Sequence, residues 1–433
     1  MKIAIAGYGV EGESNYRYWA KDPSNDITIV DEQLVPKHPL PEGAKTLLGP
    51  GVLEQLQDFD IVVRTAGLAP YKIKTHGKIW SATNEFFAKS PAQIIGVTGT
   101  KGKGTTTSMI ASIFEAAGKK VWLVGNIGIA AIDILDQVQS DDIVAFEMSS
   151  FQLWDMERSP HVAVVLLIEP DHLNVHEGME DYVRAKGAIR RFQTEDDLCI
   201  YHPTNHFSDE IAHSSSLGTI RRYGISDDGG VYVKEGSFWQ GEHIICSLDA
   251  LQLIGDHNKE NACAAITAAL SYGLSTEAIE QGLRNFKGLP HRTEFVRNLD
   301  GVDYYNDSFS SAPAATVAAI RSFTQPEIVV LGGIDKGGEF SDLARAINER
   351  QNIKELVIIG EIKQKLRDEL ASHGVNVPMT IFEGKTMPEI VDYCRGRAES
   401  GDVVILSPAC ASFDMFKDFY DRGDQFRAYV QSL

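Results

Sequence analysis

The chain has 433 residues, enough for roughly two to four domains with packed cores. Hydrophobic residues make up 43% and charged residues 23%, which excludes a disordered or collagen-like chain. There are 41 Lys and Arg against 60 Asp and Glu, so the net charge of −19 disfavours non-specific binding to nucleic acid. No apolar run reaches the roughly 18 residues of a membrane span, so we expect no membrane insertion.

The N-terminal sequence and the cysteines predict the compartment. The sequence MKIAIAGYGVEG has one positive charge and a short apolar run, unlike a secretory signal. The five cysteines are scattered and form no CxxC pair, which favours a reducing compartment over a zinc site or a disulfide framework. We therefore expect a cytoplasmic protein.

Short apolar runs alternate with helical patterns along the chain. The runs predict buried strands at 2–6, 27–31, 60–64, 94–98, 142–147, 161–168, 198–201, 327–331, 355–359 and 402–406. Such alternation is typical of α/β folds with parallel sheets. The Ser- and Gly-rich stretch 206–253 predicts a β-rich patch in the middle of the chain. We predict three α/β units, at 1–92, 93–293 and 294–433.

A glycine-rich turn gives the strongest chemical signal. The sequence GVTGTKGKGTTT, at residues 96–107, follows a predicted strand and leads into a predicted helix. This pattern is typical of a P-loop, whose N–H groups and helix N-terminus face a phosphate, with Lys103 against the β- and γ-phosphates. Gly104 replaces the usual Ser or Thr, so Thr105 or Thr106 must supply the hydroxyl for magnesium. The alternative is a structural turn with a stray lysine.

A second glycine pattern follows the first predicted strand. The sequence GYGVEG, at residues 7–12, is followed about twenty residues later by Asp31 at the end of the next strand. This spacing resembles a dinucleotide-binding fingerprint, although a structural tight turn explains it as well. Since the chain already has a P-loop pattern, a simple dehydrogenase is a poor explanation.

Two polar residues follow strands in the middle unit. Glu147 ends a predicted buried strand, where a carboxylate beside a P-loop can hold magnesium; the alternative is a solvated acid. His172 begins a loop after the apolar run 161–168. It could be a metal ligand, a substrate contact or a structural histidine.

The local sequence leaves the roles of two basic residues, Lys186 and Arg292, open. Lys186 lies on a predicted helix, where most lysines are solvated. Arg292 follows Leu289-Pro290 at a unit junction, and an arginine there can reach a transferring phosphate when domains close. A hinge salt bridge is the alternative for Arg292. In the last unit, the segments 306–308, 332–337 and 407–412 follow strands and are expected to face a ligand.

Taken together, these motifs resemble one family. They are GTKGKGTTT, GNIG, EMSSFQL, DHLNVHEGMEDYVRAK, GDHNKEN, LPHRTE, NDS, LGGIDKGGEF and LSPACASFDMFKDFYDRG, in chain order. In this order they resemble the Mur ligases, ATP-dependent amide-forming enzymes of peptidoglycan precursor assembly, over essentially the whole chain. The last three motifs look most like those of the D-glutamate-adding members. The resemblance implies a Rossmann-like N-terminal domain, a central P-loop ATPase domain and a C-terminal Rossmann-like domain.

The resemblance also implies roles for single residues. The catalytic set would be Lys103, Glu147, His172, Lys186 and Arg292. ATP contacts would come from Gly99, Thr100, Lys101, Gly102, Lys103, Gly104, Thr105, Thr106, Asn258, Asn261, Arg292 and Asp307. The UDP-linked substrate would contact Val10, Glu11, Asp31, Gly67, Asn126 and His172. D-glutamate would contact Ser311, Lys336, Ser412 and Phe419. Magnesium ligands would be Thr105, Glu147, His172 and Lys186, the last as a carbamate.

The implied reaction joins D-glutamate to UDP-N-acetylmuramoyl-L-alanine, with ATP and Mg²⁺, in a monomeric enzyme. Two departures from the family pattern are Phe309, in place of the lysine after Asn-Asp-Ser, and Ser311, in place of threonine. Gly104 makes the P-loop more similar to that of folylpolyglutamate synthases. The alternatives are another Mur-type or folylpolyglutamate-type amide ligase, and a nucleotide-dependent regulatory protein that has lost its chemistry.

Overall fold

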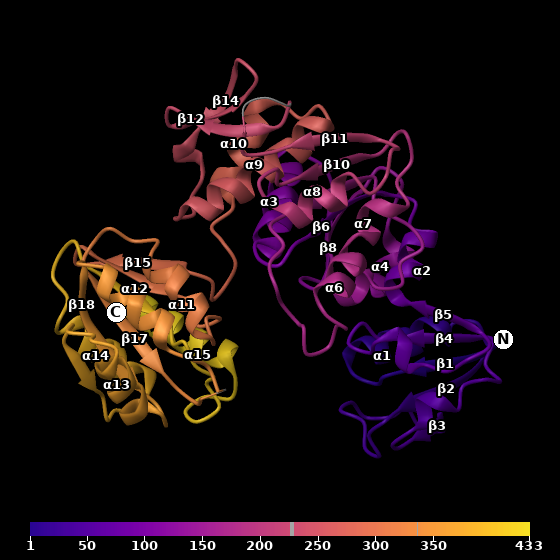
Figure 1. Cartoon of the computed structure of the whole chain (residues 1–433), viewed down its shortest axis with the longest axis horizontal. Helices are drawn as coiled ribbons and strands as arrows, with labels where there is room; N and C mark the ends of the chain where they lie inside the picture. Colours follow the sequence, from indigo (N-terminus) through magenta and orange to yellow (C-terminus); the bar gives the residue numbers. More distant parts are fainter. Residues whose placement is uncertain (226–228, 336) are drawn as a thin grey trace. The chain divides into compact units, whose positions relative to one another are not determined.

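The computed structural model describes residues 1–225, 229–335 and 337–433 (Figure 1). Its strands pair mainly in parallel and alternate with helices, which confirms the predicted α/β class. Within the described ranges, no helix combines the length and the hydropathy that a bilayer crossing requires.

The chain forms two compact units. The first contains residues 1–251 and 257–286, and the second contains residues 252–256 and 287–433. The first unit holds two parallel sheets and a small antiparallel one, and the second holds a single mixed sheet. The division into three domains at residues 92 and 293 stays a prediction.

The first sheet has the strand order β3-β2-β1-β4-β5, and every pairing is parallel. Its strands are β1 (Lys2–Ala6), β2 (Asp26–Asp31), β3 (Lys45–Leu48), β4 (Ile61–Arg64) and β5 (Lys78–Ser81). The accompanying helices are α1 (Val10–Trp19), α2 (Ala82–Lys89) and the 3-10 turns η1 (Val52–Glu54) and η2 (Pro70–Lys72). Because β1 lies between β2 and β4, its carboxyl end is a switch point, where open α/β sheets bind ligands.

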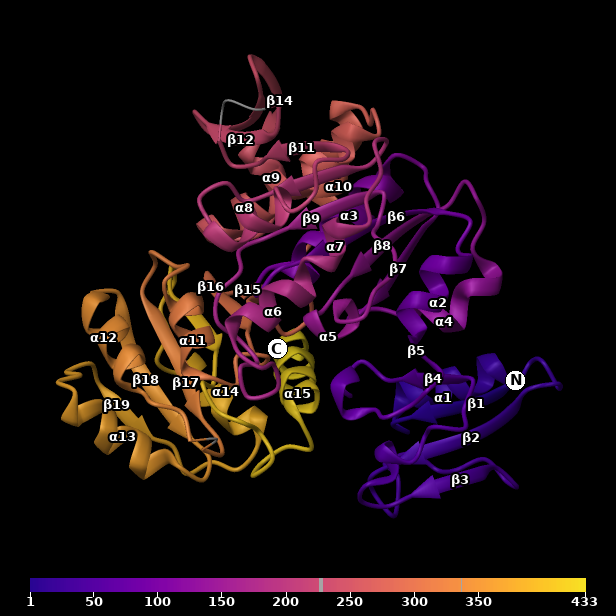
Figure 2. The ribbon, with the colours of Figure 1, turned by 45° about the vertical axis from the view of Figure 1, so that its right-hand side comes forward.

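The central sheet has the order β11-β10-β9-β6-β8-β7 and is wholly parallel. Figure 2 shows β9, β6, β8 and β7 side by side. Its strands are β6 (Gln93–Thr98), β7 (Val121–Gly125), β8 (Ile143–Glu147), β9 (Val162–Val165), β10 (Leu198–Tyr201) and β11 (Thr219–Arg222). The strand order reverses at β6, so the carboxyl end of β6 is the second switch point of this unit.

Helices and a small antiparallel sheet complete the first unit. The helices are α3 (Lys103–Ala116), α4 (Ala131–Ile134), α5 (Ser150–Leu153), α6 (Met179–Lys186), α7 (Ala188–Arg191), α8 (His206–Ala212), α9 (Asp256–Ser271), α10 (Thr276–Asn285) and the 3-10 turns η3 (Leu135–Gln137) and η4 (Leu248–Ala250). The antiparallel strands are β12 (Val231–Lys234), β13 (Ser237–Gln240) and β14 (His243–Ser247).

Two sequence predictions for this unit need correction. The run 161–168 was expected to be one strand, but β9 ends at Val165. Leu166 is apolar because it packs beneath the glycine-rich turn, where a Cβ on Gly99 would lie 2.7 Å from the Leu166 Cβ. The stretch 206–253 needs correction only at its start. Strands β11 to β14 confirm the predicted β-rich patch, but the stretch begins with helix α8, which the Asn205 side chain caps by accepting from Ser208 N–H. Residues 226–228 of that stretch lie outside the described residues.

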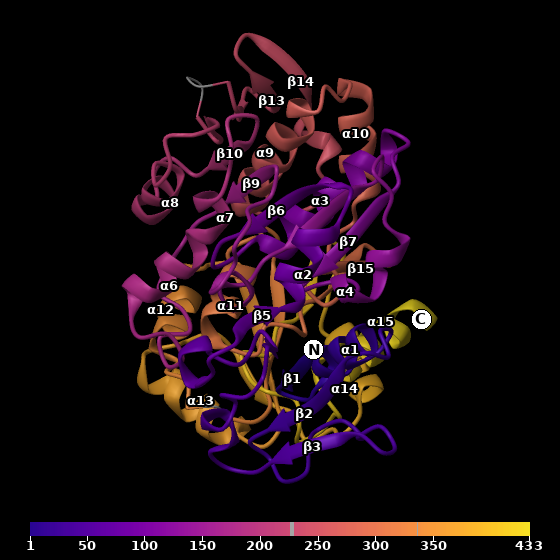
Figure 3. The same cartoon turned by 90° about the vertical axis from the view of Figure 1, so that its right-hand side faces the viewer.

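The first and central sheets are joined by polar contacts between helices. Ser14 Oγ on α1 donates to Asp133 Oδ2 on α4 at 2.8 Å. Tyr18 OH on α1 donates to Glu85 Oε1 on α2 at 2.8 Å. Helices α2 and α4 pack against each other at this junction (Figure 3). These contacts explain why the two sheets form one compact unit.

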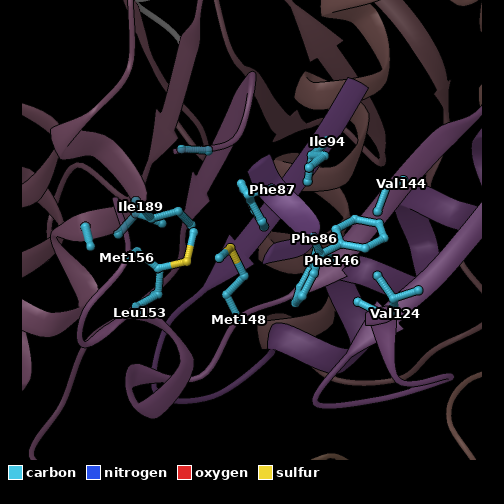
Figure 4. Packing of buried hydrophobic residues seen from close by; sticks show 14 of the residues in the cluster. Phe86, Phe87, Ile94, Val124, Val144, Phe146, Met148, Leu153, Met156 and Ile189 are labelled. Atoms are coloured by element: carbon cyan, nitrogen blue, oxygen red, sulfur yellow. The ribbon is translucent and has the colours of Figure 1, made fainter. Parts of the chain in front are cut away.

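The core of the central sheet is built around aromatic side chains (Figure 4). Phe86 and Phe87 of α2 lie 5.9 and 5.5 Å from Phe146 of β8, measured between ring centroids. Large buried rings contribute much of the hydrophobic stabilisation of such a core. Because neighbouring side chains of a strand point to opposite faces, Phe146 in this core directs Glu147 to the other face.

The second unit has a six-stranded sheet of order β15-β16-β20-β17-β18-β19, in which only β15 and β16 pair antiparallel among the described strands. The strands are β15 (Glu294–Leu299), β16 (Val302–Asn306), β17 (Glu327–Gly332), β18 (Ile353–Ile359), β19 (Met379–Ile381) and β20 (Val403–Leu406). The helices are α11 (Pro313–Ile320), α12 (Ser341–Glu349), α13 (Lys363–Ser372), α14 (Met387–Arg395) and α15 (Phe419–Ser432). Figure 1 shows these helices grouped around the sheet.

A buried carboxyl group lies at the start of β17. Glu327 is fully buried, and its Oε1 accepts from Asn352 Nδ2 at 2.8 Å. Its Oε2 has no hydrogen-bond partner among the described residues. Burial raises the pKa of Glu327 to about 8, although the Asn352 hydrogen bond and the Arg350 charge oppose the shift.

This raised pKa predicts a pH-dependent stability. The native state binds the Glu327 proton more tightly than the unfolded chain, whose reference pKa is 4.5, so the stabilisation is lost as pH rises through about 8. Glu327→Gln cannot ionise and should be more stable than wild type by about 1–3 kcal/mol at pH 8.5, with little difference at pH 5. Calorimetric Tm values between pH 5 and pH 8.5 measure this difference in stability. Glu349→Gln, which changes an exposed glutamate, is the control. If Tm depends on pH in the same way in wild type and Glu327→Gln, the raised pKa of Glu327 is contradicted.

Candidate active site

The glycine-rich turn lies at the carboxyl end of β6, the switch point of the central sheet. It connects Thr98, the last residue of β6, to Lys103, the first residue of α3. Gly99 and Gly102 have φ angles of +155° and +82°, which L side chains rarely adopt. A Cβ on Gly102 would also lie 2.4 Å from Asn261 Oδ1. The glycines therefore permit a turn whose backbone N–H groups precede a helix N-terminus, as an anion site requires.

The side-chain nitrogens of two lysines donate to one carbonyl oxygen of this turn. Lys103 Nζ donates to the carbonyl oxygens of Gly99 at 3.0 Å and Thr100 at 2.8 Å. Lys186 Nζ donates to the same Gly99 oxygen at 2.8 Å. The structure thus brings together two residues that are 83 positions apart in the sequence, both predicted as catalytic.

Lys186 is not the solvated helix lysine that its local sequence suggests. It ends α6 and is 1% exposed, and its Nζ lies 4.7 Å from the centroid of the Tyr182 ring. Burial holds the pKa of Lys186 well below its usual value, and the charge of Lys103 lowers it further. Asp171 and Glu147 oppose the shift. The arrangement favours a neutral amine at this position.

Glu147 lies at the end of β8 and is also buried, which excludes the solvated strand-end acid. Its Oε1 accepts from Asn126 Nδ2 at 3.3 Å, and its carbonyl oxygen accepts from Asn126 N–H at 3.1 Å. Its Oε2 is buried and lacks a hydrogen-bond partner in the described part of the chain. A buried, unpaired carboxylate oxygen is costly unless a cation or a donor completes the site.

The hydroxyl groups at the start of α3 differ in exposure. Thr105 is partly exposed, whereas Thr106 is fully buried, and no described residue is hydrogen-bonded to the Thr106 Oγ1. The described residues contain no group of three or more His, Cys, Asp or Glu arranged to hold a metal. Mg²⁺ is normally held by one or two carboxylates together with phosphates and waters, so Glu147 and a threonine hydroxyl fit a magnesium site of that kind.

His172 and His176 have different environments. His172 is exposed, has a φ of +54° and lies with Nε2 3.4 Å from Asp171 Oδ2. His176 is buried, with Nδ1 2.8 Å from Asp181 Oδ2 and Nε2 2.9 Å from Ser150 Oγ. Burial lowers the pKa of His176. The satisfied structural histidine is therefore His176, while His172 remains open to a metal or a substrate.

The other predicted P-loop contacts surround the same turn. Asn261 on α9 is buried beside Gly102, and its Nδ2 donates to Asn258 Oδ1 at 3.2 Å. Lys101 extends outward, and its Nζ lies 3.2 Å from Glu169 Oε2. Gly104 is buried in the first turn of α3.

The GYGVEG segment has the geometry of a tight turn between β1 and α1. Asp31 Oδ2 accepts from Tyr8 N–H at 2.8 Å, so this carboxylate fixes the turn. A Cβ on Gly12 would lie 2.2 Å from the Gly7 carbonyl oxygen, and glycine there allows the helix to pack closely on the strand. Val10 is 65% exposed at the first turn of α1.

A second turn lies at the carboxyl end of the neighbouring strand β4. Glu11 Oε2 accepts from Ala66 N–H at 2.8 Å, and Gly67 is exposed. Burial raises the pKa of Glu11, whereas the Ala66 N–H and the nearby Arg64 charge lower it. The four predicted UDP-side residues Val10, Glu11, Asp31 and Gly67 therefore lie at one edge of one sheet.

In the second unit, Asp307 follows β16. It is buried, and it accepts from Ser407 Oγ at 2.6 Å and from Thr293 N–H at 2.9 Å. Burial raises the pKa of Asp307 to about 6, and these hydrogen bonds limit the shift. The Arg292 guanidinium carbon lies 3.8 Å from the centroid of the Phe309 ring, so the residue that replaces the expected lysine provides a cation–π surface.

The predicted acceptor residues lie in loops after the strands of the second unit. Ser412 is buried, Ser311 is partly buried, and Phe419 begins α15 with its ring 5.1 Å from that of Phe309. Lys336 lies outside the described residues.

Comparisons with known proteins agree with this architecture. Residues 97–269 match the Mur ligase middle domain, and residues 291–410 match the Mur ligase glutamate ligase domain. A UDP-N-acetylmuramoylalanine–D-glutamate ligase of Clostridium kluyveri is 38% identical, and the match covers 100% of this chain and 97% of that protein. The chain belongs to the Mur ligase family.

Solved structures share the fold of this Mur ligase at low identity. The UDP-N-acetylmuramate-alanine ligase MurC of Thermotoga maritima is 18% identical with a TM-score of 0.63, and the match covers 100% of this chain and 99% of that one. The MurF ligase of Thermotoga maritima, solved in complex with ADP, is 15% identical with a TM-score of 0.60. The match covers 99% of this chain and 95% of that one.

One buried arginine of the second unit could not be predicted as a site residue from its local sequence. Arg422 on α15 is 1% exposed and donates from Nε to Ser308 Oγ at 2.9 Å and from Nη1 to the Cys410 carbonyl at 3.2 Å. Burial lowers its pKa to about 10. It joins the loops that follow β16 and β20. Its only signal in the sequence is its place in the quoted motif FYDRG, because a helix arginine is usually solvated.

The two ends of α3 provide a test of the turn geometry. Gly102→Ala introduces a Cβ against Asn261, whereas Gly118→Ala at the other end, with φ of +75°, meets no atom within 4 Å. We expect Gly118→Ala to cost about 1 kcal/mol for the left-handed backbone and Gly102→Ala about 2–3 kcal/mol. Calorimetric Tm values of the two variants measure the difference. Equal losses would mean that Asn261 does not pack against the turn.

Proposed function

We propose that this Mur ligase joins the amino group of D-glutamate to the carboxylate of UDP-N-acetylmuramoyl-L-alanine, with ATP converted to ADP and phosphate. The main structural support is that the side-chain nitrogens of Lys103 and Lys186 both donate to the Gly99 carbonyl oxygen, near the unpaired carboxylate oxygen of Glu147. The choice among amide ligases rests on full-length relatives that are named UDP-N-acetylmuramoylalanine–D-glutamate ligase.

The chemistry follows from the low reactivity of a carboxylate towards an amine. A substrate carboxylate oxygen attacks the γ-phosphorus of ATP and ADP leaves, giving an acyl phosphate. The nitrogen of D-glutamate then attacks the acyl carbon, loses a proton, and expels inorganic phosphate with one former carboxylate oxygen. The enzyme contributes positioning and charge stabilisation more than covalent chemistry.

The nucleotide would lie on the glycine-rich turn of the first unit. Lys103 would leave the carbonyl oxygens of its own turn and meet the β- and γ-phosphates, towards which the backbone of residues 99–104 can direct N–H groups. Asn258 and Asn261 would contact the adenine side. Arg292 and Asp307 of the second unit are proposed as further ATP contacts.

Glu147, Thr105 or Thr106, His172 and Lys186 would hold Mg²⁺. Bound Mg²⁺ neutralises phosphate charge and orients phosphate oxygens. Lys186 has the depressed pKa that a reaction with CO₂ needs, because only the neutral amine is nucleophilic. Its nitrogen would bond to the carbon of CO₂ and release a proton, which converts a cation into a carboxylate suited to a metal.

The substrates would lie at the carboxyl edges of the sheets. Val10, Glu11, Asp31 and Gly67 are proposed to hold the UDP part of the nucleotide-linked substrate, with Asn126 and His172 nearer the reacting carboxylate. Ser311, Lys336, Ser412 and Phe419 are proposed for D-glutamate. We further propose that the enzyme is a cytoplasmic monomer.

The test is an ADP-release assay with UDP-N-acetylmuramoyl-L-alanine and a panel of amino acids. D-glutamate should give a kcat/KM at least about tenfold above those of L-glutamate, D-aspartate and L-lysine. A shorter side chain leaves buried donors unpaired at about 1–3 kcal/mol each, and inversion at Cα moves the amine away from the acyl phosphate.

Three other outcomes would contradict the proposal in different ways. ADP release with L-glutamate only when a folate replaces UDP-N-acetylmuramoyl-L-alanine would favour a folylpolyglutamate-type ligase. A preference for a diamino acid would indicate another Mur ligase. Failure to release ADP with every acceptor would favour a regulatory protein.

A further inference from the structure

Arg64, the last residue of β4, is fully buried although it carries a charge. Its Nε donates to Asp155 Oδ2 at 2.7 Å, and its Nη2 donates to Asp155 Oδ1. This two-point pairing matches the planar fork of a guanidinium to the two oxygens of one carboxylate. Arg64 and Asp155 are 91 positions apart in the sequence. Arg64 ends a strand of the first sheet, and Asp155 lies two residues after the end of α5.

The remaining N–H groups of Arg64 donate to backbone carbonyl oxygens, most of them in the turn at residues 65–68. Nη1 lies 3.3 Å from the carbonyl oxygens of Thr65 and Ala66 and 3.2 Å from that of Leu68. Nη2 also donates to the Phe151 carbonyl on α5 at 2.8 Å. Every nitrogen of the guanidinium is therefore committed to the protein, which leaves no donor for a substrate.

The turn held by Arg64 belongs to the proposed UDP site. It contains Gly67, and its Ala66 N–H donates to Glu11 at the first turn of α1. On the other side, α5 begins three residues after Glu147, and its N-terminus is fixed by a reciprocal capping box between Ser149 and Gln152. One guanidinium thus links the UDP-side turn to the segment that follows Glu147.

We infer that Arg64 is a positioning residue: through Asp155 and Phe151 it sets the turn of residues 65–68, and hence the UDP-linked substrate, relative to Glu147. The inference rests on the proposed function. A buried ion pair contributes little net stability compared with an apolar replacement, but it fixes one geometry because all its partners must be satisfied together. Lysine keeps the charge but lacks the planar fork, so it cannot reproduce these contacts.

The experiment compares Arg64→Lys with Arg190→Lys. Arg190 is equally buried in the same unit and donates to the Ala212 carbonyl at 3.2 Å and to Gln193 Oε1 at 2.7 Å, at the β11 side of the central sheet. Arg64→Lys should raise the KM for UDP-N-acetylmuramoyl-L-alanine and the Kd for UDP, by calorimetry, about tenfold, with the KM for ATP within about twofold. Arg190→Lys should lower Tm without changing either constant.

Equal UDP affinity in wild type and Arg64→Lys would overturn the inference, and so would an equal loss in Arg190→Lys. If Arg64→Lys does not fold, Asp155→Asn decides, because it removes one acceptor of the fork while the carbonyl contacts of Arg64 stay. Asp155→Asn should then raise the Kd for UDP as well, and an unchanged Kd would overturn the inference. Wild-type protein that binds UDP but forms no amide would contradict the proposed function and leave the UDP test of Arg64 valid.

Discussion

The Gly99 carbonyl oxygen accepts hydrogen bonds from the side-chain nitrogens of both Lys103 and Lys186, and the chemistry of the first unit depends on this arrangement. Burial lowers the pKa of Lys186 strongly, and the charge of the neighbouring Lys103 lowers it further. The unpaired Glu147 oxygen lies on the next strand of the same sheet. Such a site is suited to receive phosphate groups with a cation.

The parallel sheets explain why polar residues from distant parts of the chain meet. In each of the three larger sheets, most of the residues that we propose as contacts follow the carboxyl ends of strands, as expected in open α/β sheets; Asn258, Asn261 and Arg292 are exceptions. Buried arginines then fix the loops that extend from those strands. Arg64 does so for the turn after β4, and Arg422 does so for the loops after β16 and β20. The fold places the strands, and these ionic and carbonyl contacts set the loops.

Apolar runs and glycine spacing were sufficient to predict the α/β class, most inner strands and the glycine-rich turn between β6 and α3. Inner strands of parallel sheets are buried on both faces, so their sequences are almost continuously apolar. The strands β3, β5, β7, β15, β16 and β19 were not predicted. Of these, β3 and β5 are short and partly exposed edges, and their sequences lack that signal. The burial of Lys186 and Arg64 could not be predicted locally, because their partners lie 87 and 91 positions away.

The proposed chemistry depends on Lys186 as a neutral buried amine that takes up CO₂ and becomes a metal-binding carboxylate. The most direct measurement is ¹³C NMR of the protein in ¹³C-labelled bicarbonate. The account predicts one carbamate resonance in wild type, its loss in Lys186→Met, and its retention in Lys101→Met, which removes an exposed lysine of the same turn. No carbamate resonance in wild type, or one that survives Lys186→Met, would contradict the account.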